Sequence, residues 1–233
     1  TVTGFTGVGD DIVITGDASY ETILTSTARD IVNANGGNDT IHGSLGADTL
    51  NGGTGIDTLN YSASNAGVTV NMGLQTASGG HATGDTISGF ESVVGSAHND
   101  NFYGYYSGSN YTFDGGGGHD YILAYGTADT VLGGSGNDTI ARQIDLASIG
   151  ATLNGGTDSD TLRVFAGAVG VGDFRDDTVI NFETLTMEGS GFSYGVRFMA
   201  SQFTQFQTVT ALSHVGHARH VVIDMGTMTV LDL

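Results

Sequence analysis

The chain has 233 residues, a net charge of −19 at pH 7, and 39 glycines with no proline, cysteine or lysine. Such acidity repels nucleic acid and anionic membranes, and the absence of cysteine excludes a disulfide framework. No stretch is long and apolar enough to span a bilayer, and the glycines follow no collagen period. The chain starts with neither Met nor a signal peptide, so we expect a processed or excised piece of a protein.

Residues 1–60 contain a nine-residue repeat, clearest at Gly52–Asn60, which reads G-G-x-G-x-D-x-U-x with U a large apolar residue. Counting back in nines from Asp57 gives an acid in each repeat, and a one-residue insertion brings the earliest acid into phase. These acids are Asp48, Asp39, Asp30, Glu21 and Asp11. The predicted inward positions are all aliphatic: Val13, Ile23, Val32, Ile41, Leu50 and Leu59.

Residues 61–94 lack the repeat and are predicted to bridge two arrays. Val68–Met72 alternates as a strand does, and Thr86–Val94 is typical of another coil of the same spiral. Residues 95–163 form the second array, with clear copies at Gly115–Leu123 and Gly133–Ala141. Its acids are Asp100, Asp120, Asp129, Asp138 and Asp160, and its inward residues are Phe102, Phe113, Ile122, Val131, Ile140, Leu153 and Leu162.

Residues 164–233 carry no repeat and are predicted to be an irregular β flank or cap, with a helix possible near Phe198–Phe206. The segment His214–His220 has three histidines, but the β pattern after it favours a loop over a zinc or copper site. Short echoes, such as Phe90-Glu91 and Phe182-Glu183, suggest that the chain is two copies of one unit.

The repeat itself indicates hard-cation chemistry. Glycines permit positive φ and let carbonyl oxygens converge, and the aspartate adds a carboxylate oxygen. Calcium takes six to eight such oxygens, whereas magnesium demands tighter geometry and zinc prefers Cys and His. The candidate calcium ligands are the turn glycines Gly36, Gly53, Gly55, Gly116, Gly118, Gly134 and Gly136 and the acids Asp11, Asp30, Asp39, Asp48, Asp57, Asp100, Asp120, Asp129, Asp138 and Asp160. Asp158 replaces a turn glycine and weakens the case for the last site.

On these motifs the chain resembles the RTX, or haemolysin-type, family of calcium-binding repeats. The resemblance implies an all-β fold: a right-handed parallel β-roll or β-helix solenoid, ending here in the irregular flank. It also implies that repeats n and n+2 share an ion, so that carboxylates about 18 residues apart pair. We expect roughly four to eight Ca²⁺ ions, with an apo chain that folds on binding them. Export by a type I machine to the outside of a bacterial cell is a further implication.

The leading functional prediction is a non-catalytic, secreted calcium-binding module of an adhesin or surface layer, with self-assembly or cell-surface polysaccharide as partners. Two alternatives stay open: a C-terminal folding and export module of a secreted hydrolase or polysaccharide enzyme, and a calcium-dependent glycan-binding module. Tyrosines between Tyr103 and Tyr125 could stack on sugars, although packing around an insertion explains them more simply. No nucleophile elbow, zinc-protease motif or P-loop is present, so no enzyme is predicted.

Overall fold

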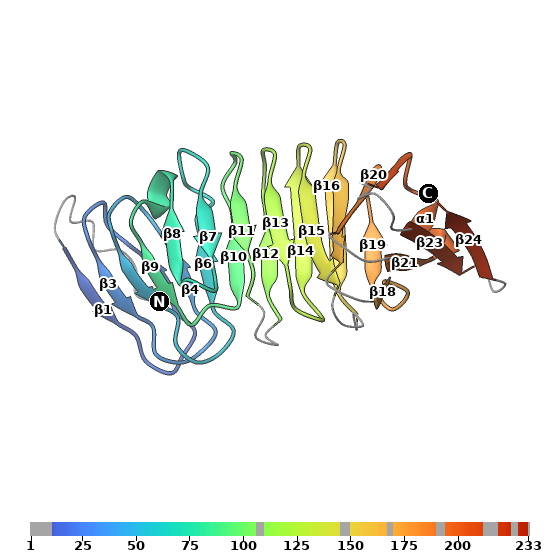
Figure 1. Cartoon of the computed structure of the whole chain (residues 1–233). Helices are drawn as coiled ribbons and strands as arrows, with labels where there is room; N and C mark the ends of the chain where they lie inside the picture. Colours follow the sequence, from blue (N-terminus) through green and yellow to red (C-terminus); the bar gives the residue numbers. More distant parts are fainter. Residues whose placement is uncertain are drawn as a thin grey trace.

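The computed structural model describes residues 11–105, 110–144, 150–166, 170–189, 194–211, 219–224 and 228–232. Its described part is almost wholly β, and Figure 1 shows narrow strands stacked side by side along one long axis. Parallel pairing dominates: a strand pairs with the strand one coil further along, as Ile41 with Leu59 and Ile122 with Ile140. The described part is therefore a β-solenoid of about eight coils, as the repeat period predicted.

Two long sheets form the walls of the solenoid. Sheet A has twelve strands, in spatial order β1 (Val13–Thr15), β3 (Ile31–Asn33), β5 (Thr49–Asn51), β9 (Thr86–Ser88), β8 (Thr76–Ser78), β7 (Thr69–Asn71), β11 (Asn101–Tyr103), β13 (Tyr121–Ala124), β15 (Thr139–Ile144), β17 (Thr161–Ala166), β20 (Thr184–Gly189) and β22 (Thr208–Ala211). Sheet B has eight, in spatial order β19 (Thr178–Ile180), β16 (Thr152–Thr157), β14 (Thr130–Ser135), β12 (Thr112–Asp114), β10 (Ser92–Val94), β6 (Thr58–Asn60), β4 (Thr40–His42) and β2 (Thr22–Leu24).

A third sheet follows the solenoid and contains β18 (Gly170–Asp173), β21 (Tyr194–Met199), β23 (Arg219–Asp224) and β24 (Met228–Asp232). The short helix α1 (Ala200–Phe203) lies where the sequence allowed a helix, and a 3₁₀ turn, η1, spans Gly80–Ala82. Among the described residues, no helix is long and apolar enough to cross a membrane.

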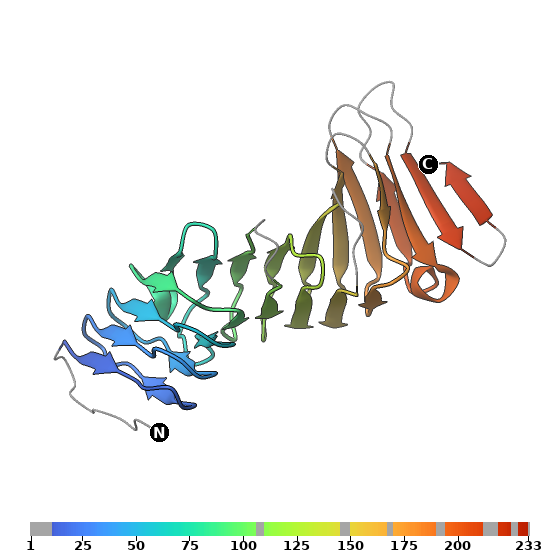
Figure 2. The same ribbon diagram turned by 90° about the horizontal axis from the view of Figure 1, so that it is seen from below.

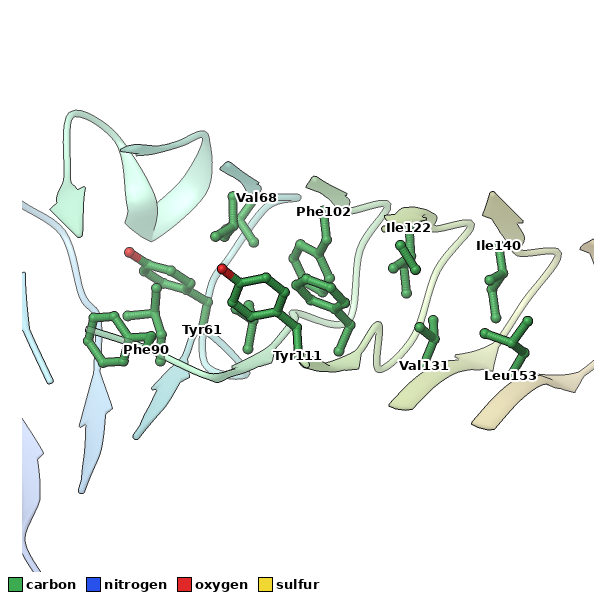
Figure 3. Close-up of a cluster of buried hydrophobic side chains, with 14 of the residues drawn as sticks. Tyr61, Val68, Phe90, Phe102, Tyr111, Ile122, Val131, Ile140 and Leu153 are labelled. Carbon is green, nitrogen blue, oxygen red and sulfur yellow. The ribbon is translucent and has the colours of Figure 1, made fainter. Parts of the chain in front are cut away.

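The core is a double row of apolar side chains between Sheets A and B, and Figure 3 shows part of it. Each three-residue strand turns its middle side chain inward, because successive side chains alternate between the two faces of a strand. Twelve of the thirteen predicted inward residues are fully buried: Ile23, Val32, Ile41, Leu50, Leu59, Phe102, Phe113, Ile122, Val131, Ile140, Leu153 and Leu162. Each contributes about 1.5–3 kcal/mol of transfer free energy.

The register of the first coil was predicted wrongly. Ile14, paired with Val32, is the buried residue of β1, while Val13 is 74% exposed. Ile12 therefore occupies the position that an acid holds in later coils, and its N–H donates to Asp30 Oδ1 at 3.0 Å. Asp11 lies one residue too early and instead makes an exposed ion pair with Arg29. The physical reason is that the larger Ile14 side chain fills the inward position.

The bridging segment 61–94 bends the solenoid. Between the third and fifth coils, Sheet A contains β9, β8 and β7, whereas Sheet B contains only β10. The hairpin of β7 and β8 is antiparallel and adds two strands to one wall. At about 4.8 Å per strand, that wall is locally longer by roughly 10 Å. Figure 2 accordingly shows the first three coils turned relative to the later ones.

Candidate metal sites

Each strand of the solenoid is preceded by one turn position that is usually acidic, and these positions form two ladders. Asp57 Oδ1 accepts the N–H of Asp39 at 2.7 Å, and Asp138 Oδ1 accepts the N–H of Asp120 at 2.8 Å. The acids preceding Sheet A strands, called the A row, are Asp30, Asp48, Asp85, Asp100, Asp120, Asp138, Asp160 and Glu183. Those preceding Sheet B strands, the B row, are Glu21, Asp39, Asp57, Glu91, Asp129 and Asp177.

The predicted carboxylate pairs are neighbours within these rows, except that of Asp11 with Asp30, because Asp11 pairs with Arg29 instead. Asp48 Oδ1 accepts the N–H of Asp30, and Asp57 does the same for Asp39. The two pairs that span insertions are also adjacent. Asp120 accepts the N–H of Asp100, and Asp160 accepts that of Asp138, both at 2.8 Å. The extra residues are therefore looped out without breaking the A row.

Several acids keep a second carboxylate oxygen that is buried and receives a hydrogen bond from no described atom. We call these open carboxylates. In all of them but Glu21 the first oxygen accepts an N–H of the backbone ladder, while the second has no donor among the described residues. Within the described residues they include Glu21, Asp39, Asp48, Asp57, Asp120, Asp138 and Asp160. A buried anionic oxygen without a partner costs several kcal/mol, so each open carboxylate marks a position where a cation would be stabilising.

The pKa values of several open carboxylates are raised, as expected for buried acids without a cation. Burial raises the pKa of Asp120 to about 8 and that of Asp48 to about 7, and neighbouring row acids add to both shifts. Burial likewise raises the pKa of Asp160 to about 6. Without a cation, the folded chain therefore favours protonated carboxyl groups at Asp120 and Asp48 up to about neutral pH, and a bound divalent ion would reverse that preference.

Other row acids are closed by the protein itself. Ser26 donates its N–H to Asp30 Oδ2 at 2.6 Å, and Ser96 donates its N–H to Asp100 Oδ2 at 2.6 Å. Both serines stand at the second place of their repeat, where the well-formed copies have glycine. Asp85 differs, because Tyr61 donates its hydroxyl to Asp85 Oδ2 at 2.6 Å. In these turns protein donors supply part of what a metal would supply.

Five of the open carboxylates face a backbone carbonyl oxygen across a space beside a glycine: Glu21, Asp57, Asp120, Asp138 and Asp160. A Cβ on Gly133 would collide with Asp138 Oδ2 and the Gly155 carbonyl oxygen. A Cβ on Gly52 would meet Asp57 Oδ2 and the Gly89 carbonyl oxygen in the same way. Each space thus joins a carboxylate oxygen of one turn to a carbonyl oxygen of the next coil's turn. That donor set is the kind calcium takes.

The predicted turn glycines mostly lie where the backbone requires them. Positive φ occurs at the second and fourth places of the repeat, at Gly53, Gly55, Gly116, Gly118, Gly134 and Gly136. The earlier repeat is an exception, because positive φ falls on Asn35 and Gly37, and Gly36 lies between them at the third place. Asp158 adopts positive φ at 86° in place of glycine, so that turn keeps its shape and Asp160 stays open.

Backbone oxygens must supply most of any coordination here. Among the described residues, no group of three or more His, Asp or Glu side chains is arranged to hold a metal ion. One or two row carboxylates per position, with carbonyl oxygens, suit a cation of high coordination number such as calcium. The chemistry disfavours zinc, because no thiolate or imidazole cluster converges on the described turns.

Four row acids were missed by the reading of the repeat: Asp85, Glu91, Asp177 and Glu183. Asp85 Oδ1 accepts the N–H of Asp48 at 2.8 Å, and Glu183 Oε2 accepts that of Asp160 at 2.7 Å. None follows a recognisable glycine turn, so the nonapeptide did not mark them. The signal that could have found them is an acid followed by Thr or Ser and then an aliphatic residue, as in Asp85-Thr86-Ile87.

The tyrosines divide between core and surface. Tyr111 is buried and packs on Phe113 with ring centroids 5.7 Å apart, in agreement with the simpler prediction. Tyr103, Tyr105 and Tyr125 instead line a groove with Leu74 and Leu123. The histidines His214 and His217 lie outside the described residues.

The fold and the rows of turn acids define a calcium-binding β-solenoid. Residues 25–59 and 112–140 match the family model described as RTX calcium-binding nonapeptide repeat (4 copies). The chain therefore carries RTX repeats folded as a β-roll, and these repeats bind calcium. No curated protein matches the chain.

Proposed function

We propose that this chain is a non-catalytic module that calcium folds outside the cell, as part of an adhesin or surface layer. The observation that carries the proposal is the set of open carboxylates, five of which face a carbonyl oxygen of a neighbouring coil's turn. One Ca²⁺ at each of the seven described open carboxylates gives seven ions, within the expected range of four to eight. Residues of the turns would hold the ions, and the ions would supply the charge that the buried acids lack.

The charge of the chain supports a calcium-controlled folding step. At −19, the unbound chain repels itself, and the second oxygens of the described open carboxylates have no hydrogen-bond donor. RTX repeats are typical of type I-secreted extracellular proteins, and low cytosolic calcium would keep such a chain unfolded until export. Calcium near millimolar outside the cell suits weak sites of the extracellular class. The same logic serves an export module of a secreted hydrolase, which is the main alternative.

The test is a calcium titration of chelated protein, followed by far-UV circular dichroism and light scattering. We expect a cooperative gain of β signal with growth of particle mass, because the described sheets end in the edge strands β1 and β2, whose backbone groups can pair with another chain. A β signal with constant monomer mass would favour the folding and export module. If calcium changes neither signal, the proposed function is wrong.

A glycan-binding role is a second candidate, favoured by the groove of Tyr103, Tyr105 and Tyr125. Tyr105 is 50% exposed, and aromatic rings beside a polar rim can stack on sugars. A glycan array probed with calcium-loaded chain tests this role, with Tyr105→Ala as the variant and Tyr20→Ala, another exposed tyrosine far along the chain, as the control. If Tyr20→Ala reduces glycan binding as much as Tyr105→Ala does, the groove is not the binding site.

A further inference from the structure

A buried arginine stands among the apolar side chains of the core. Arg142 lies on β15, and its side chain is 4% exposed. Its neighbours in the same inward column of Sheet A are Ala124 and Val164, both buried and apolar. Taking a guanidinium out of water is costly unless anions and acceptors surround it. Its presence at this position therefore requires a partner across the solenoid.

Two acids of the B row lie beside Arg142. Its Nη1 lies 3.8 Å from Asp129 Oδ2, and its Nη2 donates to the carbonyl oxygen of Thr127 at 3.4 Å. Asp177 interacts with it electrostatically as well, and both carboxylates raise the pKa of Arg142 against the lowering effect of burial. A single cation thus serves two buried acids.

The acid of the intervening coil is missing. Along the B row the strands pair as Thr130 with Thr152 and Thr152 with Thr178, so Ala151 lies between Asp129 and Asp177. Its N–H still donates to Asp177 Oδ1, at 2.9 Å. The coil that contains Ala151 also contributes Arg142 through β15. In this coil Ala151 stands where most other coils have an acid of the B row, and Arg142 adds a positive charge beside that row.

Asp129 is also closed in its own turn. Its Oδ1 accepts the N–H of Tyr111, and its Oδ2 accepts the N–H of Gly126 at 2.7 Å. The repeat positions that need positive φ in a calcium turn hold Tyr125 and Thr127, and neither has positive φ. Asp129 thus differs in geometry from Asp138, whose Oδ2 is buried without a described donor.

We infer that the Arg142 guanidinium takes the place of calcium between Asp129 and Asp177. This inference rests on the proposed function, because it assigns which turns of the calcium module need no ion. The B row from Asp129 to Asp177 is then stabilised by Arg142 with or without calcium, while the A row beside it depends on calcium. An internal ion pair replaces the calcium-ligand role that the repeat predicted for Asp129.

The experiment compares Asp129→Asn with Asp138→Asn by counting bound calcium per chain in equilibrium dialysis. Asp138→Asn is expected to bind one ion fewer than wild type, whereas Asp129→Asn keeps the wild-type number. Arg142→Met and Asp129→Asn are each expected to lower the Tm in saturating calcium by roughly 5–15 °C. The double variant should lose less than the two single losses combined, because the pair is coupled.

The outcomes separate this inference from the proposed function. If Asp129→Asn loses one ion as Asp138→Asn does, Asp129 is a calcium ligand and the inference is overturned. If the wild type binds no calcium, or Asp138→Asn loses none, the proposed function fails instead. Should Asp129→Asn fail to fold, Asp129→Asn with Arg142→Met keeps the wild-type net charge and decides. If this double variant binds as many calcium ions as wild type, the inference is supported. If it binds one ion fewer, the inference is overturned.

Discussion

The A row and the B row follow the same spiral but treat charge differently. From Asp100 to Glu183 the A row places an acid before every strand, and three successive members, Asp120, Asp138 and Asp160, are open. The B row starts in the same way, with Glu21, Asp39 and Asp57, and is then interrupted by Tyr111 and Ala151.

The two rows show that the ladder of backbone hydrogen bonds does not depend on how the charge of the turn acids is compensated. Tyr111 and Ala151 still donate their N–H groups to the next acid, so the ladder of hydrogen bonds continues without their carboxylates. What changes is the demand for a cation. Well-formed glycine turns leave that demand to calcium, whereas the turns of Asp100, Asp85 and Asp129 meet it with a serine, a tyrosine and an arginine, respectively.

The largest effect is expected from filling a glycine turn of the A row. In Gly136→Ala the new Cβ would collide with the Gly118 carbonyl oxygen, and the alanine would have to keep the positive φ of 113°. Together these effects cost roughly 2–5 kcal/mol of folding free energy. Gly150→Ala is the matched control, because its φ is also positive at 80° but nothing lies within 4 Å of the Cβ. Thermal melting in calcium measures both. Equal losses would show that strain alone, and not the tight stacking, limits the turn.

The next effect is the loss of one open carboxylate. Asp120→Asn keeps an oxygen for the N–H of Asp100 but removes the charge that faces the carbonyl oxygens. We expect one calcium ion fewer and, at calcium 100-fold above the Kd, a loss of about 2.7 kcal/mol. Isothermal titration together with melting curves tests this. Glu188→Gln is the control, because Glu188 pairs with Arg163 outside both rows. An unchanged ion count in Asp120→Asn would contradict the role of the open carboxylates.

A third prediction is a gain of calcium binding at a turn whose acid is closed by protein donors. In Ser96→Gly with His98→Gly the turn 95–100 becomes Gly-Gly-Ala-Gly-Asn-Asp, which restores both glycine positions. The hydroxyl of Ser96 no longer donates to Asp100 Oδ1, at a cost of about 1 kcal/mol without calcium. We expect tighter calcium binding at this turn, measured by titration. Ala97→Gly adds a glycine to the same turn but keeps the Ser96 hydroxyl bond to Asp100, and a similar gain there would point to flexibility as the cause.

Sequence predicted the solenoid well because its information is local and periodic. The middle residue of each strand and the glycines with positive φ are fixed by contacts that repeat every nine residues, so the repeat alone assigns Leu59 and Gly134 correctly. The first coil failed because Val13 and Ile14 are both aliphatic and the register was ambiguous. The ion pair of Arg142 with Asp129 was unpredictable, because it joins residues far apart in the coil whose contact depends on the three-dimensional fold.

The smallest effect is a pH dependence that separates the two kinds of carboxylate. In the calcium-free fold burial raises the pKa of Asp48 to about 7 and that of Asp120 to about 8, from an ordinary value of 3.8. The folded form therefore holds protons that the unfolded chain releases above about pH 4. The contribution of these two acids to the stability of the calcium-free fold is therefore fully present below about pH 4 and is lost as the pH rises through about 7 to 8.

Calcium competes with those same protons, so its affinity changes in the opposite direction. We expect the calcium concentration at half-saturation to fall by roughly tenfold between pH 5.5 and 8, with release of protons into the solvent. Titrations at a series of pH values, with proton release followed by a dye, measure both quantities. Asp120→Asn removes the acid with the highest of these pKa values and should flatten the dependence between pH 7 and 8. A half-saturation point that stays constant across this range would mean that calcium binds away from the buried carboxylates, at exposed groups whose protons are already lost.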